Sequence, residues 1–180
     1  TGYGCVYFAD EMLKNKSESF KGKTVAISGS GNVAQYALEK VLHLGGTVLT
    51  VSDSGGFLYA ADGFQTDKLN FLMELKNVRR GRLKEMAEAF DDVQYFEGQR
   101  AWNLPVNVDI ALPCATQNEL NKEDALLLVS KGLKLVAEGA NMPSTPEAIE
   151  VFSESGIAFA PGKASNAGGV AVSGLEMSQN

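Results

Sequence analysis

The chain alternates between short runs of apolar residues and longer stretches in which apolar residues recur at helical spacing. The apolar runs predict strands, which cover residues 24–28, 47–52, 108–113, 133–139 and 157–162. The helical spacing predicts helices, which cover the opening segment with Val6, Phe8, Ala9, Met12 and Leu13, and residues 32–44, 66–77, 83–90, 122–130 and 146–155. Shorter strand candidates lie at residues 57–59, 93–98 and 101–102. Strands and helices therefore alternate along most of the chain.

This order of elements predicts the fold class. Residues 24–28 are apolar on both faces, as in a parallel sheet that is covered by helices on both sides. Parallel strands need crossover connections, and the helices between the strands supply them. The sequence therefore predicts an α/β fold, Rossmann-like and doubly wound, with a mainly parallel sheet and helices on both faces. Ligands of such sheets bind at the carboxyl ends of the strands, where this chain is rich in Gly, Ser, Asn and Thr.

A glycine-rich turn joins the first predicted strand to the helix after it. Residues 29–34 read Gly-Ser-Gly-Asn-Val-Ala, the G-x-G-x-x-A form of a dinucleotide-binding turn. In this form Gly29 allows the tight turn, Gly31 lets the backbone approach a pyrophosphate, and Ala34 allows close packing of helix on strand. Amides at the start of the helix face the phosphates. The turn predicts dinucleotide binding by Gly29, Ser30, Gly31, Asn32 and Val33, and a purely structural corner is the alternative.

The residues after the second strand leave the choice of coenzyme open. Asp53 ends that strand, where a carboxylate favours NAD because it binds the ribose hydroxyls and repels a 2′-phosphate. The hydroxyls of Ser52 and Ser54 on either side of it can instead donate to a phosphate. A basic cluster follows, made of Lys76, Arg79, Arg80 and Arg82. The cluster indicates either a phosphate site or a solvated helix end with cations near its C-terminus.

Composition excludes several classes of partner. The net charge of −6 argues against a nucleic-acid surface, because an acidic protein repels the phosphate backbone. No apolar run approaches the roughly 20 residues that a membrane span needs. The chain has one histidine and two widely separated cysteines, Cys5 and Cys114, so we expect no metal site and two free thiols. We therefore expect a cytoplasmic protein that binds neither nucleic acid nor membrane.

Six motifs together resemble the coenzyme domain of hexameric glutamate dehydrogenases of the bacterial and fungal type. The motifs read TGYG, SGSGNVAQYALEK, VSDSGG, ALPCATQNEL, VAEGANMP and FAPGKASNAGGVAVSGLEM, and the resemblance spans essentially all 180 residues. It implies a reversible reaction in which L-glutamate, NAD(P)+ and water give 2-oxoglutarate, ammonium and NAD(P)H. It also implies that the full-length protein is a homo-hexamer.

The resemblance assigns roles to particular residues. The Ser-Asp-Ser pattern at residues 52–54 is similar to that of NADP-preferring members, in which serines and basic side chains meet the 2′-phosphate. This implies NADP as the coenzyme, with NAD possible, and it assigns Lys76, Arg79 and Arg82 to the 2′-phosphate. Ala115, Thr116, Gln117, Asn141 and Thr1 are expected around the nicotinamide and its ribose. The residues expected to contact the substrate are Asn166, Val170 and Ser173.

The same resemblance leaves this chain without a catalytic residue. In the family, the lysines and the aspartate that do the acid–base chemistry lie in a separate substrate domain, and we find no such group here. The chain also starts without methionine inside a predicted helix and stops inside another one. We therefore expect residues 1–180 to be an excised coenzyme domain without turnover of its own. The alternatives are an NAD-preferring or dual-specificity enzyme, another amino-acid dehydrogenase, and a non-catalytic nucleotide-binding module.

Overall fold

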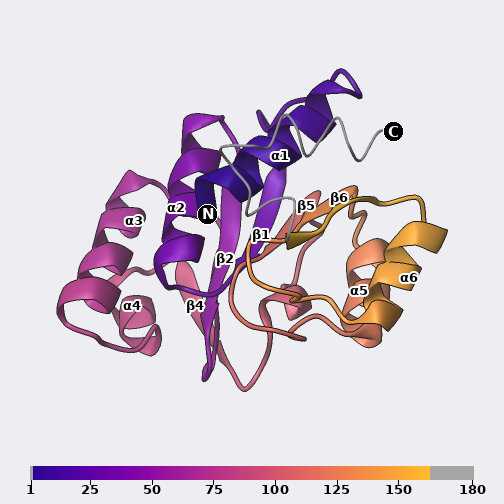
Figure 1. Cartoon of the computed structure of the whole chain (residues 1–180). Coiled ribbons are helices and arrows are strands. Elements are labelled where there is room, and N and C mark those ends of the chain that lie inside the picture. Colours follow the sequence, from indigo (N-terminus) through magenta and orange to yellow (C-terminus); the bar gives the residue numbers. More distant parts are fainter. Residues whose placement is uncertain (1, 163–180) are drawn as a thin grey trace.

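A computed structural model describes residues 2–162, which form a mixed α/β structure around a seven-stranded sheet (Figure 1). The strands are β1 (Thr24–Ser28), β2 (Thr47–Asp53), β3 (Gly56–Ala60), β4 (Val93–Glu97), β5 (Ile110–Pro113), β6 (Leu135–Ala137) and β7 (Ala158–Ala160). The helices are α1 (Gly2–Lys14), α2 (Asn32–His43), α3 (Thr66–Met73), α4 (Lys84–Ala89), α5 (Lys122–Ser130) and α6 (Pro146–Glu154). A π-helix, η1 (Glu74–Val78), continues α3, and η2 (Ala101–Asn103) is a single 3₁₀ turn.

The order of the strands creates a change of direction beside β1. The sheet runs β4-β3-β2-β1-β5-β6-β7, and β1 pairs in parallel with both β2 and β5. The chain therefore winds from β1 to β2 on one side, and later continues through β5, β6 and β7 on the other. A crevice at the carboxyl ends of the strands is expected where the winding reverses, between β1 and β5. On the β2 side, β3 and β4 add an antiparallel edge.

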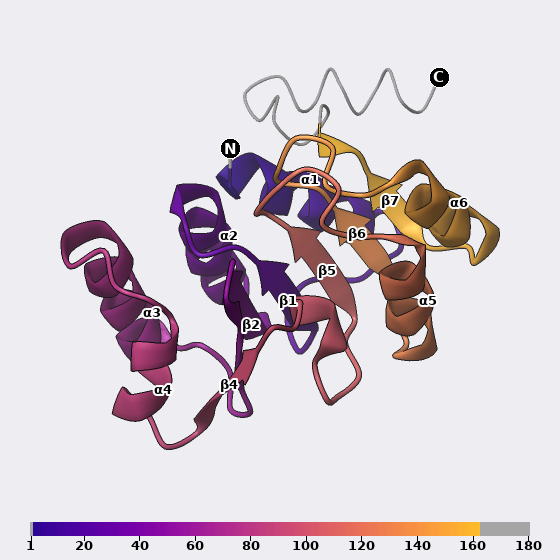
Figure 2. The same ribbon diagram turned by 90° about the horizontal axis from the view of Figure 1, so that it is seen from below.

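Successive strand residues point into two separate cores. Val25 and Ile27 of β1 join a core cluster with Leu38 of α2, whereas Ala26 between them joins a second cluster with Trp102 of η2 and Phe152 of α6. This alternation follows from the two-residue period of a strand. Figures 1 and 2 show α1 beside α2, and α5 beside α6 near the β6–β7 edge. Helices thus contribute apolar residues to the cores on both faces of the sheet.

The observed elements differ from the predicted ones at two places. The strand predicted at residues 101–102 is wrong, because these residues form the 3₁₀ turn η2. That turn packs against β1, β2 and β3 on the face of the sheet, and it buries Trp102 completely. The helix predicted over residues 66–77 is α-helical only to Met73 and then becomes the π-helix η1. No helix in the described part of the chain is long and apolar enough to cross a membrane.

Candidate functional site

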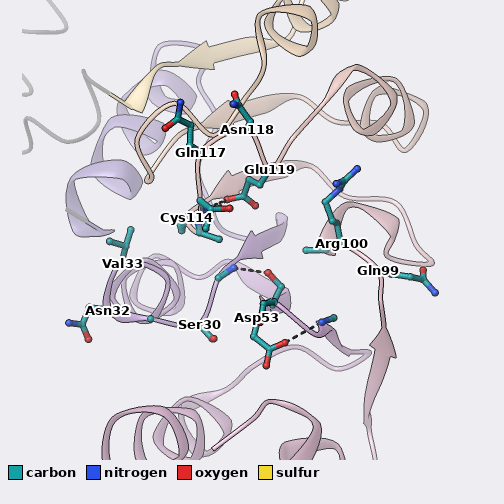
Figure 3. Close-up of a pocket in the computed structure, with 18 of the residues that line it drawn as sticks. Ser30, Asn32, Val33, Asp53, Gln99, Arg100, Cys114, Gln117, Asn118 and Glu119 are labelled. Carbon is teal, nitrogen blue, oxygen red and sulfur yellow. Dashed lines mark hydrogen bonds between the residues drawn. The ribbon is translucent and has the colours of Figure 1, made fainter. Parts of the chain in front are cut away.

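A cleft of about 700 Å³ lies at the carboxyl ends of β1, β2 and β5. Four segments line most of it, residues 29–33, 52–54, 98–101 and 114–119. Figure 3 shows Asn32 and Val33 on one side of this cleft, and Gln99 and Arg100 on the opposite side. The cleft therefore forms where the strand order places a ligand site, and it contains the glycine turn that the sequence singles out.

Gly29 is held in place by contacts with both neighbouring strands. Its φ of +90° is a left-handed conformation, and a Cβ at this position would lie 2.9 Å from the carbonyl oxygen of Cys114. The Gly29 amide donates to Ser52 Oγ at 2.7 Å, and the Ser52 amide donates back to the Gly29 carbonyl at 3.0 Å. These bonds fix the turn to β2, and the Cys114 carbonyl after β5 leaves no room for a side chain, so only glycine suits this position.

Gly31 has different surroundings. Its φ is −83°, which any residue adopts, and an added Cβ would meet no protein atom within 4 Å. Gly31 is also the N-cap of α2, and no side chain caps this helix. In contrast, side chains cap α5 and α6 through Asn121 and Thr145. The first-turn amides of α2 therefore face the cleft without a capping side chain, an arrangement that suits an anion.

The carboxylate of Asp53 faces the β2–β3 turn and the segment before α4. Its Oδ1 accepts from the Gly55 amide at 2.9 Å and from the Gly56 amide at 3.2 Å. Its Oδ2 accepts from the Leu83 amide at 3.3 Å and pairs with Arg82 Nε at 3.5 Å. The side chain is only 8% exposed. Both carboxylate oxygens of Asp53 thus already accept hydrogen bonds from the protein, so few acceptor positions remain for ribose hydroxyls.

Arg82 extends from the segment before α4 to the end of β2. Its Nη2 donates to Ser54 Oγ at 3.4 Å, and its side chain is 61% exposed. Gly55 leaves room for it, since a Cβ there would lie 2.7 Å from Arg82 Nη2 and 2.7 Å from the Tyr95 hydroxyl. A guanidinium and a serine hydroxyl, both donors, therefore meet beside the β2 end of the cleft. Two donors at this position suit a phosphate.

Arg82 touches Ser54 of the lining but is not itself a lining residue, and the other predicted basic residues and Asn141 do not line the cleft either. Lys76 Nζ donates to the Gly81 carbonyl at 3.1 Å, next to Arg82 in the chain. The Arg79 guanidinium lies over the ring of Phe71, 5.3 Å from its centroid. Asn141 is not among the residues that line the cleft. Of the remaining predicted site residues, Thr1, Asn166, Val170 and Ser173 lie outside the described residues.

The loop after β5 brings Ala115, Thr116 and Gln117 to the cleft, together with a carboxylate that the sequence reasoning missed. Glu119 Oε2 accepts from the amides of Ala115 and Thr116, at 2.9 Å each. Burial raises the pKa of Glu119 above the usual 4.5, against the opposing effect of these hydrogen bonds. An acid among the polar residues at the end of a strand was the only signal for it in the sequence.

Gln99 and Arg100 are two further lining residues without a sequence signal. Arg100 Nε pairs with Asp124 Oδ2 at 3.1 Å, and Asp124 also belongs to the capping box of α5. The segment before η2 is thereby tied to the first turn of α5. Sequence spacing does not reveal this contact, because residues 98–101 belong to no periodic element.

Cys114 lines the cleft, and its thiol interacts with that of Cys5 on α1. Its hydrogen bond with Cys5, which favours the protonated thiol, and its own burial raise the pKa of Cys114 well above its usual value. Cys5 Sγ also lies 3.2 Å from the Ala137 carbonyl, and both cysteines are free. Because a nucleophilic cysteine needs its thiolate, Cys114 is not equipped for covalent chemistry at neutral pH. Among residues 2–162, no cluster of three His, Cys, Asp or Glu could hold a metal ion.

Comparison with known proteins identifies the family. The model of the family described as Glutamate/Leucine/Phenylalanine/Valine dehydrogenase matches residues 1–180. The chain is 60% identical over 180 residues to an NADP-specific glutamate dehydrogenase of Haemophilus influenzae, and 58% identical to an NAD(P)-specific glutamate dehydrogenase of Xylanibacter ruminicola. It covers 39% and 40% of those two proteins, so it spans about two fifths of their length.

Solved structures agree with this result. The crystal structure of Plasmodium falciparum glutamate dehydrogenase superposes with a TM-score of 0.90 at 49% identity, over 99% of this chain and 38% of that one. An L-tryptophan dehydrogenase from Nostoc punctiforme shares the fold, with a TM-score of 0.60 at 20% identity, over 94% of this chain and 42% of that one. With its whole length matched by the family model, the chain belongs to the glutamate/leucine/phenylalanine/valine dehydrogenase family.

Proposed function

We propose that residues 1–180 are the NADP(H)-binding domain of a glutamate dehydrogenase, with a Rossmann-like, doubly wound fold. The observation that carries the proposal is the Gly29–Val33 turn, which opens on the cleft at the start of α2. A Cβ at Gly31 would stand in that cleft without touching protein, so packing does not explain the glycine. Close approach of the protein backbone to a ligand does explain it. The residues of the cleft therefore fit a dinucleotide.

In this proposal the turn holds the pyrophosphate. The amides that follow Gly31 at the start of α2 donate to its oxygens, and the positive end of the helix dipole adds to the attraction. Gly29 and Ser52 keep the turn in position through their reciprocal hydrogen bonds. Ser30, Asn32 and Val33 form the rest of this wall of the cleft.

The end of β2 favours NADP over NAD. Asp53 is occupied by the amides of the β2–β3 turn and by Arg82, so its charge is partly neutralised. Arg82 and Ser54 present donors for a 2′-phosphate, and Lys76 and Arg79 add positive charge nearby in the sequence. The NADP-specific relative supports this choice, and the NAD(P)-specific relative leaves NAD as the alternative coenzyme.

The other half of the coenzyme then lies along β5. Ala115, Thr116 and Gln117 border that end of the cleft. We assign Asn141 and Thr1 to the nicotinamide end as well, and Asn166, Val170 and Ser173 to the substrate. The bound coenzyme supplies hydride transfer, whereas the residues of this chain bind and orient it.

The full-length protein is proposed to convert L-glutamate, NADP+ and water reversibly to 2-oxoglutarate, ammonium and NADPH, as a cytoplasmic homo-hexamer. The relatives are about two and a half times as long as this chain, so the remaining length has room for a substrate domain. We assign the acid–base residues of the reaction to that part of the protein.

The test is a coenzyme comparison in the full-length protein. Replacing both Lys76 and Arg82 by Ala is expected to raise the KM for NADPH about tenfold or more, since a charged hydrogen bond contributes about 1.5–3 kcal/mol. The KM for NADH should stay nearly constant, because NADH lacks the 2′-phosphate. Lys84→Ala, an exposed charge on the neighbouring helix, is the matched control. Equal effects on both coenzymes would contradict the assignment, and turnover of leucine in preference to glutamate would contradict the substrate.

A further inference from the structure

Glu119 fixes the backbone of the loop that precedes it. Its Oε2 accepts two hydrogen bonds of 2.9 Å from consecutive amides, those of Ala115 and Thr116. Asn118, in between, has a φ of +58°, and this left-handed residue turns the chain back on itself. One carboxylate oxygen thus closes the loop through bonds that are stronger than neutral ones when the acid is ionised.

The same carboxylate is connected to β1. The Cys114 amide donates to Ser28 Oγ at 3.0 Å, and the Ser28 side chain acts on Glu119 in turn, where it lowers the pKa of the carboxyl. Ser28 ends β1, and Cys114 directly follows β5, so the network ties the two strands together where the winding reverses. Three consecutive amides, at residues 114–116, are thereby held by Ser28 and Glu119. Figure 3 shows Glu119 beside Cys114 at this end of the cleft.

The position of this network relates it to one half of the coenzyme. The strands bordering the cleft lie in the order β2-β1-β5. With the pyrophosphate at the β1 turn and the 2′-phosphate at Ser54 and Arg82 beside β2, the nicotinamide riboside half extends toward β5. Residues 114–119 therefore border the reactive half of the molecule, and not its adenosine half.

We propose that Glu119 is a positioning residue whose ionised carboxylate holds the backbone of residues 115 and 116 in the conformation that receives the nicotinamide riboside. This inference rests on the proposed function of the cleft. Glu119 acts through the loop, so its removal affects one half of the ligand and leaves the other half bound as before. A residue that merely supports the fold would affect both halves.

The network predicts that the affinity for NADPH depends on pH on the acidic side of the pH profile, which we call the acid limb. Burial, helped by the charge of Asp124, raises the pKa of Glu119 above the usual 4.5, while Ser28 and the two amides oppose the rise. Asp124 on α5 is itself paired with Arg100, and Cys114 at the end of β5 also faces the carboxylate. As the pH falls through the pKa of Glu119, protonation removes the charge that strengthens the two amide bonds. The affinity for NADPH is therefore expected to decrease on the acidic side.

The experiment uses the full-length protein and two ligands, NADPH and adenosine 2′,5′-bisphosphate, which lacks the nicotinamide riboside. Glu119→Gln keeps the shape of the side chain and an amide oxygen as acceptor, but it removes the charge. We expect it to weaken NADPH binding about tenfold, as for a loss of about 1.4 kcal/mol, and to leave the bisphosphate unchanged. The variant should also lose the part of the acid limb that comes from Glu119. Glu123→Gln, an exposed glutamate in the first turn of α5, is the matched control.

Two results would overturn the role of Glu119: NADPH binding with the affinity and pH profile of the wild type, or equal weakening of both ligands. If Glu119→Gln fails to fold, Ser28→Ala tests the same network from β1, and it too should weaken NADPH alone. Absence of NADPH binding by the wild-type protein is a different failure, because it contradicts the proposed function itself.

Discussion

The two glycines of the turn after β1 are required for different reasons. The fold requires glycine at residue 29. Its φ of +90° is left-handed, and a Cβ there would lie 2.9 Å from the Cys114 carbonyl oxygen, so a side chain is excluded. Gly31 satisfies no packing requirement, since its backbone is ordinary and a Cβ would touch no protein atom within 4 Å. A glycine that the fold does not need is a sign that a ligand needs it.

This difference predicts opposite results for two alanine substitutions. Gly29→Ala is expected to lower the free energy of unfolding by about 1–2 kcal/mol or more, from the left-handed backbone alone. Gly31→Ala should change it by no more than about 0.5 kcal/mol, as at an unconstrained surface site. Yet Gly31→Ala should weaken NADPH binding about tenfold, the equivalent of about 1.4 kcal/mol, because the methyl group takes the place of the phosphate.

Urea denaturation and NADPH titration of the two variants separate these effects. If Gly31→Ala unfolded as easily as Gly29→Ala, or bound NADPH like the wild type, the turn would be a structural corner. In that case the pyrophosphate assignment would be wrong.

At the scale of elements, the π-helix η1 links the basic segment to the glycine turn. Asn77 in η1 and Gln35 in α2 exchange two side-chain hydrogen bonds, of 3.0 and 3.1 Å. Gln35 is almost completely buried and also donates to the Ser30 carbonyl at 2.8 Å. A π-helix departs from the regular α-helical register, and such departures often occur at functional sites. One pair of amide side chains thus links these elements by hydrogen bonds.

Asn77→Ala tests this link. It leaves the buried Gln35 with one partner fewer, so the free energy of unfolding should fall by about 1–3 kcal/mol. The loss should be visible as a lower midpoint in urea, and the KM for NADPH should rise more than that for NADH, because η1 carries Lys76. Asn70→Ala, at an exposed position of α3, is the control and should be neutral. A neutral Asn77→Ala would mean that packing alone holds η1 against α2.

Elements with strong end signals were predicted well, and those fixed by contacts were not. The helices that begin at Lys122 and at Pro146 follow the capping residues Asn121 and Thr145, so their starts are encoded locally. No residue in the sequence marks the change from α3 to η1 at Met73, and η1 is the part of this helix that bonds to α2 through Asn77. Trp102 favours strands, but its segment forms a 3₁₀ turn whose indole is buried against the sheet.

For the whole molecule, the order of the strands locates the cleft. Loops that are far apart in the sequence meet because β2, β1 and β5 end side by side. The described lining contains Glu119, Asp53 and Arg100 as charged groups and no lysine. The chain also spans only about two fifths of its glutamate dehydrogenase relatives. We therefore expect the chain tested by itself to retain at most weak coenzyme binding and to lack the dehydrogenase reaction.

We predict that the isolated 180-residue chain shows no NADPH formation from glutamate and NADP+ and binds NADP(H) weakly at best, while the full-length protein turns over. The reason is that general acid–base catalysis requires a side chain within hydrogen-bond reach of the substrate, and we assign those groups to the rest of the protein. Absorbance of NADPH measures turnover, and a titration measures binding. Turnover by the isolated chain would contradict the assignment of the catalytic groups to another domain.

The sequence by itself determined the α/β class, most element positions and the glycine turn, because these depend on local periodicity, capping and the special backbone of glycine. From the sequence, Asp53, Ser54 and Arg82 are candidates for binding the coenzyme, but the sequence does not say which of them binds a ribose hydroxyl or a phosphate and which binds other protein groups. Only the tertiary structure decided that Asp53 turns to the β2–β3 hairpin and to Arg82, and that Glu119 closes the loop at β5. These roles depend on hydrogen bonds between segments that the fold brings together, and local sequence does not specify which donor meets which acceptor.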